Sequence, residues 1–125
     1  MFRFMTQRLH AYIDYPVALG LIIAPFVLGI GMGPSSAWAF AISVIVGLSA
    51  LVLTALTDHE TGVLPVIPYT LHLLVDGAVG VGFLAAPFLL NFAGLDALYY
   101  WVLGAAILLV VAADRSATSQ MQPAE

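Results

Sequence analysis

The chain has 125 residues, of which 62% are hydrophobic and only 8% are charged, with three arginines, no lysine and seven acidic residues. A soluble domain carries about 25% charged residues, so this composition all but excludes a soluble monomer. Three arginines cannot neutralise a track of phosphates, which makes nucleic acid a poor partner. The absence of cysteine excludes disulfides, iron–sulfur clusters, thiolate zinc sites and covalently attached c-type haem.

Four apolar segments are candidates for membrane spans, because a bilayer core of about 30 Å needs about 20 apolar residues of helix. They cover residues 9–29, 37–57, 68–90 and 97–113. None of them has a wide polar face, as contact with lipid requires. We therefore predict an all-α polytopic membrane protein in the lipid bilayer. Four transmembrane helices form a single domain over residues 1–125, and residues 115–125 are a flexible cytoplasmic tail.

The first segment also resembles the apolar core of a signal peptide. It is longer than a typical signal core, contains Asp14, and has Pro25 near its end in place of a small-residue cleavage site. We therefore expect it to remain in the membrane as the first helix.

The ends of the predicted spans carry their own signals. A serine of the loop at 29–36 is placed to cap the second helix, Pro68 suits the first turn of the third, and Asp96 is placed to cap the fourth. Aromatic residues near the ends are expected to form an interfacial belt. These are Tyr12, Tyr15, Trp38, Tyr69, Tyr99, Tyr100 and Trp101.

The sequence contains an internal repeat with a constant offset of 62 residues. The match joins 9–14 (LHAYID) to 71–76 (LHLLVD), and continues to Ala24-Pro25-Phe26 and Ala86-Pro87-Phe88. Repeat 1 covers about residues 9–58 and repeat 2 about residues 71–114. Each repeat holds two spans, so both enter the membrane from the same side. This predicts two tandem helical hairpins that are parallel repeats, related by a pseudo-two-fold axis along the membrane normal.

The Pro25-Phe26 pair and its counterpart Pro87-Phe88 stand late in the first helix of each repeat. This pattern, with the order His, Asp, Gly, Pro in both repeats, resembles the SPW-repeat family of small bacterial integral membrane proteins. Here the family's Ser-Pro-Trp motif is degenerate and reads Ala-Pro-Phe. The resemblance implies membrane location and a two-span repeat, and it supplies no activity or catalytic residue. Each proline either kinks its helix or simply ends it, and the second interpretation is slightly favoured.

The three arginines set the expected orientation. Arg3, Arg8 and Arg115 fall on one side of four spans, and the two opposite loops contain no basic residue. The positive-inside rule therefore predicts a multi-pass protein of the bacterial cytoplasmic (inner) membrane with both termini in the cytoplasm.

Four titratable residues fall inside the predicted spans, namely His10, Asp14, His72 and Asp76. The histidine and the aspartate of each repeat are four residues apart, which stacks them on one face of a helix. Residues of this kind normally face the interior of a bundle. One turn later, Ala18 and Gly80 are small enough to allow close helix approach. Gly77 and Gly82 are also interpreted as packing notches.

These four residues are compatible with three functions. The leading hypothesis is a membrane scaffold or interaction subunit, stabilised by a buried His/Asp cluster and assembled with itself or with another membrane protein. The second is a small transporter, or a protein that binds a metal ion or protons at these residues. The third is a b-type haem protein with His10 and His72 as ligands.

Other polar residues and motifs add little to this choice. One interpretation is an acidic vestibule beside the site, enlarged by Asp58, His59, Glu60 and Asp114. For the first three, which lie in the central loop, the alternative is a solvated loop. No phosphate loop, nucleophile elbow, zinc-protease motif or dinucleotide fingerprint is present, so we expect a protein that is not an enzyme. No cofactor is predicted, and a metal ion or haem b is the alternative.

Overall fold

The computed structural model describes residues 7–32, 37–57, 62–64 and 66–114, and side chains from Tyr12 onward. These residues form four helices and confirm the all-α prediction. The helices are α1 (Gln7–Leu28), α2 (Trp38–Leu56), α3 (Tyr69–Leu90) and α4 (Gly94–Ala113). The predicted tail at 115–125 lies outside the described residues.

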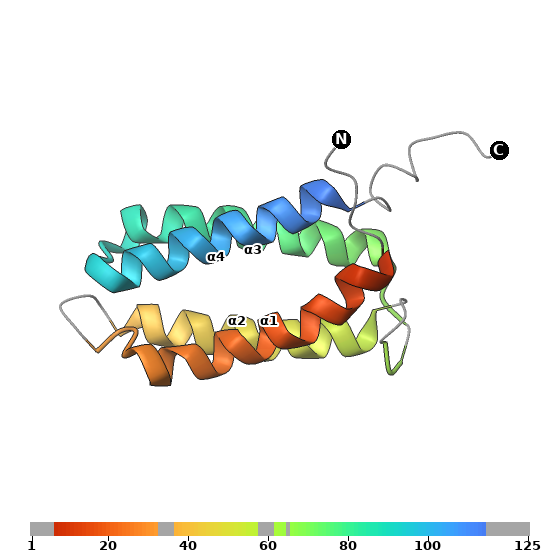
Figure 1. Cartoon of the computed structure of the whole chain (residues 1–125), viewed down its shortest axis with the longest axis horizontal. Helices are drawn as coiled ribbons and strands as arrows, with labels where there is room; N and C mark the ends of the chain where they lie inside the picture. Colours follow the sequence, from red (N-terminus) through yellow and green to blue (C-terminus); the bar gives the residue numbers. More distant parts are fainter. Residues whose placement is uncertain (1–6, 33–36, 58–61, 65, 115–125) are drawn as a thin grey trace.

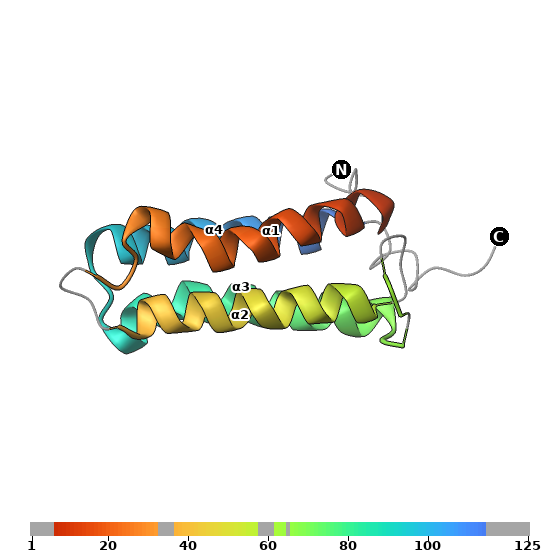
Figure 2. The same cartoon turned by 90° about the horizontal axis from the view of Figure 1, so that it is seen from below.

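The helices are arranged as two antiparallel hairpins that lie side by side (Figures 1 and 2). α1 packs along α2, and α3 packs along α4, whereas α2 and α3 touch each other at few points. Both hairpins begin at the same end of the bundle (Figure 1). Contacts between the hairpins are therefore made by a limited set of side chains.

The helices have the length and surface of a membrane protein. Within the described residues, α2, α3 and α4 are each long and apolar enough to cross a bilayer, and α1 contains a shorter apolar stretch, Tyr12–Leu28. Large apolar side chains are exposed on every helix, among them Phe26, Val52, Leu74 and Leu109. This outward apolar surface indicates contact with lipid.

Small residues bring the two helices of each hairpin into backbone contact. A Cβ atom on Gly47 of α2 would lie 2.9 Å from the carbonyl oxygen of Ala18, and one on Gly104 of α4 would lie 2.8 Å from that of Gly80. Ala18 and Gly80 therefore form the predicted notches, and the same contact occurs in both hairpins. Such close approach is how membrane helices gain van der Waals contact without a hydrophobic driving force.

Two other glycines of α3 were wrongly interpreted as notches. A Cβ atom on Gly77 or on Gly82 would meet no atom within 4 Å. Both positions face open space, because the helix partner lies on the side of Gly80.

The two motif prolines stand in the last turn of their helices. Gly29 and Asn91 follow α1 and α3 in the left-handed conformation, with φ of 70° and 59°. The N–H of Ile30 donates to the Pro25 carbonyl at 3.0 Å, and that of Phe92 donates to the Pro87 carbonyl at 3.1 Å. Both are helix-ending bonds that satisfy carbonyls of the last turn. Phe26 and Phe88, the aromatic residues of the motif, are exposed.

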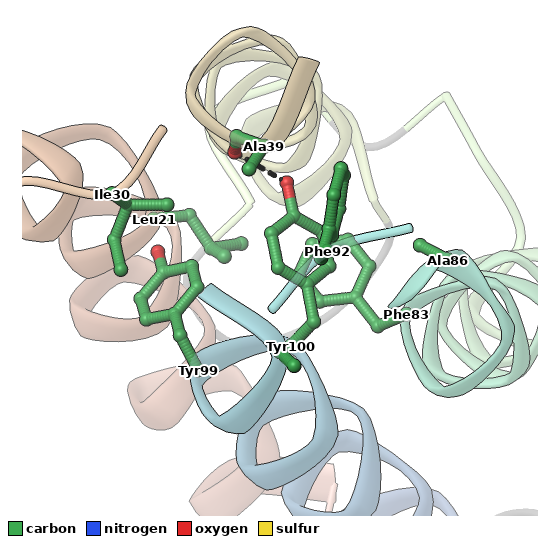
Figure 3. Close-up of a cluster of buried hydrophobic side chains, with 9 residues drawn as sticks. Leu21, Ile30, Ala39, Phe83, Ala86, Phe92, Tyr99 and Tyr100 are labelled. Atoms are coloured by element: carbon green, nitrogen blue, oxygen red, sulfur yellow. Dashed lines mark hydrogen bonds between the residues drawn. The ribbon is translucent and has the colours of Figure 1, made fainter. Parts of the chain in front are cut away.

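A buried aromatic cluster joins the hairpins at the end where α1 ends and α4 begins (Figure 3). The Tyr100 hydroxyl donates to the Ala39 carbonyl of α2 at 2.6 Å. The Ser43 hydroxyl donates to the Leu21 carbonyl at 2.8 Å and therefore accepts from the Tyr99 hydroxyl, 2.6 Å away. Leu21 precedes Pro25 by four residues, so its carbonyl lacks the usual helical donor and is available to Ser43.

Three of the tyrosines expected in the interfacial aromatic belt lie elsewhere. Tyr69, Tyr99 and Tyr100 are buried, with hydroxyl groups that bind other helices, and do not belong to an aromatic belt. Tyr12, Trp38 and Trp101 are exposed, as a belt requires.

The N-termini of the helices also differ from the predictions. Pro68 directly precedes α3 and is not in its first turn. The serines predicted to cap the second helix lie outside the described residues, and α2 follows Ala37, which makes no side-chain cap bond. α4 begins at Gly94, three residues before the predicted start, so Asp96 lies in its first turn and is no cap. The Asp96 side chain instead accepts from the Gly31 N–H at 3.0 Å, in the loop after α1.

The close contact at Gly104 can be tested by adding one methyl group. Gly104→Ala is expected to lower the free energy of unfolding in detergent by about 1 to 3 kcal/mol, because its Cβ would press on the Gly80 backbone. Gly82→Ala is the matched control, since it faces open space and gains helix propensity of up to about 1 kcal/mol. Equal stability of the two variants would contradict the contact.

Candidate functional site

His72 lies at the centre of a polar group that joins the two hairpins. It belongs to α3 and is 1% exposed. Its Nε2 atom is 3.1 Å from Oδ2 of Asp14, on α1, and 3.2 Å from Oδ2 of Asp76, one turn further along α3. We call these three residues the Asp–His–Asp group. Asp76 reaches His72 through the i,i+4 spacing of a continuous helix, whereas Asp14 reaches it only through the packing of the hairpins.

The second ring nitrogen of His72 has a defined partner. Nδ1 is 2.7 Å from the Thr57 hydroxyl, which in turn donates to the Leu53 carbonyl at 2.5 Å. Because the single hydroxyl proton is used for Leu53, Thr57 accepts a hydrogen bond from the Nδ1–H of His72. This bond fixes the ring and leaves Nε2 as the atom that faces the two carboxylates.

Thr57 is held in place by the end of α2. It follows the last helical residue, Leu56, and pairs with Ile67 in an isolated β-bridge. The sequence analysis did not identify Thr57 as part of the site. In the sequence, Thr57 could have been found only from its position at the end of an apolar span, on the same side of the predicted bundle as His72.

The Asp–His–Asp group forms part of the wall of a cavity of about 330 Å³ between the two hairpins. All four helices contribute to the wall, and Ser49 and Thr54 are the other polar residues among those that line it. The rest is aliphatic: Ile13, Val17, Leu21, Val46, Ala50, Leu53, Val75, Val79, Leu103, Ala106, Ile107 and Val110. The site therefore combines one polar end with an otherwise apolar chamber.

A second buried pair lies next to His72. The Tyr69 hydroxyl donates to Oδ2 of Asp114 at 2.5 Å, and the Tyr69 ring stacks on the imidazole with a centroid separation of 6.0 Å. Asp114 has no exposed surface, so its expected place in a solvated acidic vestibule is wrong. This carboxylate instead ties the end of α4 to the start of α3.

Not every predicted site residue can be placed. The structure brings together Asp14, His72 and Asp76, but the side chain of His10 lies outside the described residues. Asp58, His59 and Glu60 also lie outside them. Pro16 does not interrupt α1, which is continuous from Gln7 to Leu28.

The geometry of His72 bears on the haem hypothesis. Both ring nitrogens are engaged, Nδ1 by Thr57 and Nε2 by the two carboxylates. In this arrangement an iron atom at Nε2 would have to displace both aspartates from the ring.

The two carboxylates of the Asp–His–Asp group face the same ring nitrogen, so a positive charge between them is favourable. With Nδ1 protonated, the Nε2 lone pair and two carboxylate oxygens converge, and one atom of each residue lies within 4.8 Å of the others. Ligand atoms 2.0–2.1 Å from one metal ion lie about 2.9 Å apart at a right angle and about 3.3 Å apart at the tetrahedral angle. The two separations from Nε2 to the carboxylate oxygens, 3.1 and 3.2 Å, fall between these values.

Comparisons with protein-family models, with curated proteins and with solved structures find no match to this chain. The resemblance to SPW-repeat proteins therefore stays a prediction, and the function has to be argued from the site alone.

The role of Thr57 can be tested with an isosteric change. Thr57→Val is expected to lower the free energy of unfolding by about 1 to 3 kcal/mol, because it leaves the buried Nδ1–H of His72 without an acceptor. Thr57→Ser keeps the hydroxyl and should retain most of the stability. Thermal unfolding in detergent measures both, and a serine variant as unstable as the valine variant would rule out the hydrogen bond as the cause.

Proposed function

We propose that this chain is a four-span integral membrane protein that binds a divalent transition-metal ion at Asp14, His72 and Asp76. The observation that carries the proposal is the convergence of the Nε2 atom and two carboxylate oxygens at 3.1 and 3.2 Å, with Nδ1–H directed at Thr57. Two carboxylates on one imidazole nitrogen are favourable only with positive charge between them, which a metal ion or a proton on Nε2 supplies. The proposed function is binding rather than catalysis, in keeping with the lack of a catalytic motif in the sequence.

The donor set suits a particular range of metals. One imidazole and two carboxylates are ligands for Zn²⁺, Fe²⁺ and Mn²⁺. A metal-binding histidine usually donates its other N–H to a second residue, and Thr57 has that role here. A divalent ion also neutralises the two carboxylates, which lowers the cost of keeping them inside a membrane.

The membrane arrangement belongs to the same proposal. α1 is the fourth span, and the two hairpins are parallel repeats of the SPW type. The recurrence of the glycine contact at Gly47 and Gly104, and of the helix ends at Gly29 and Asn91, supports the repeat. The arginine distribution supports a bacterial inner-membrane protein with both termini in the cytoplasm.

Metal content tests the proposal directly. Protein purified in detergent without chelator, or reloaded separately with Zn²⁺ or Mn²⁺, should hold about one ion per chain by elemental analysis. Asp14→Asn and Asp76→Asn should each reduce affinity at least tenfold, because a neutral amide is a poorer ligand. Asp96→Asn is the matched control, since it alters a buried carboxylate outside the site. Wild-type protein that binds no metal ion in any of these preparations would refute the proposal.

A purely structural role is the second candidate, and one contact favours it. With a proton on Nε2, His72 bridges Asp14 and Asp76 directly and fastens α1 to α3 without any ion. This is the scaffold hypothesis in its simplest form.

The structural candidate makes its own prediction. In metal-free protein, Asp14→Asn should lower the free energy of unfolding by about 3 kcal/mol, as the loss of one partner from a buried ion pair does. If Asp14→Asn and the wild type melt at the same temperature in chelator, this candidate is excluded, and metal binding remains as the reason for the group.

A further inference from the structure

The cavity beside the Asp–His–Asp group is larger than a metal ion requires. It measures about 330 Å³, and its walls are aliphatic apart from the polar end, Ser49 and Thr54. An apolar cavity of about 150 Å³ is already enough to bind benzene. The size and chemistry of this chamber therefore fit a small organic molecule.

A metal ion at the polar end would be open to this chamber. The group supplies three ligand residues, and all three line the cavity. Metal sites with three protein ligands keep at least one position for an exogenous ligand. Because all three residues line the cavity, an exogenous ligand would reach the metal ion from the apolar space.

Charge restricts what can fill that position. Two carboxylates and one divalent ion sum to zero when the imidazole is neutral. An ionised head group would add an uncompensated charge in an apolar chamber, which is costly. A hydroxyl or carbonyl oxygen adds none and still supplies a lone pair to the metal.

We propose that the cavity binds a neutral, mostly apolar molecule whose single hydroxyl or carbonyl oxygen completes the coordination of the metal ion. This inference rests on the proposed metal site and names the ligand class of that site. Because about 150 Å³ is enough for the six carbon atoms of benzene, this cavity has room for roughly a dozen non-hydrogen atoms. Ser49 of α2, Val75 of α3 and Ala106 of α4 line the cavity and are also exposed, so the cavity is open to the surroundings.

The test uses Co²⁺ as a reporter, because its visible spectrum changes with coordination number. Full-length protein in lipid nanodiscs is loaded with Co²⁺ and titrated with 1-decanol, with decane or with decanoate. Decanol should change the visible absorption saturably, and decane should not. Decanoate should act at least tenfold more weakly than decanol.

Two variants locate the effect. Ala50→Phe places a bulky side chain in the cavity and should abolish the decanol response while Co²⁺ still binds. Ile45→Phe, on an exposed position of the same helix that is not part of the cavity wall, should leave the response intact. Retained Co²⁺ binding shows in each case that the variant has folded.

The possible results separate the two proposals. If Co²⁺ binds but decanol causes no saturable change, the ligand inference is wrong and the metal site stands. An equal response to decane, or an equal response in Ala50→Phe, also overturns the inference. If neither Co²⁺ nor another metal ion binds, the proposed function fails, and the ligand inference fails with it.

Discussion

The arrangement of the whole bundle depends on one buried histidine held between two carboxylates from different hairpins. Asp14 and Asp76 meet His72 at 3.1 and 3.2 Å, in a chain whose outward surface is apolar. Isolated charges in such surroundings are strongly unfavourable, so each must be paired or bound to an ion. Because the contact joins α1 to α3, whatever stabilises these charges also fixes the hairpins relative to each other.

The opposite end of the bundle is joined by different chemistry. Tyr100 donates to Ala39, and Tyr99 donates to Ser43, which in turn reaches the Leu21 carbonyl that Pro25 leaves without a helical donor. Helices of different hairpins pack on each other far less than the two helices within each hairpin, and a cavity lies between the hairpins. The cavity thus lies between hairpins that are joined to each other at both ends.

The sequence predicted the features that depend on pattern and spacing. Apolar length located the four helices, and the His-to-Asp spacing located Asp76 beside His72. The small residues Ala18 and Gly80 marked the true notches. The failures share a cause: a helix that is apolar on all sides does not reveal which face packs inward. Tyr99, Tyr100 and Asp114 were therefore assigned to surfaces, and Thr57 was missed, because only the packing of the hairpins brings it to His72.

The central claim is that His72 and Asp14 interact across the two hairpins. A double-mutant cycle in metal-free protein measures this directly, with Asp14→Asn, His72→Gln and the double variant unfolded in the same detergent. The account predicts that the double variant is less destabilised than the sum of the two single variants, with a coupling free energy of about 1 kcal/mol or more. Additive effects, with a coupling free energy near zero, would contradict it.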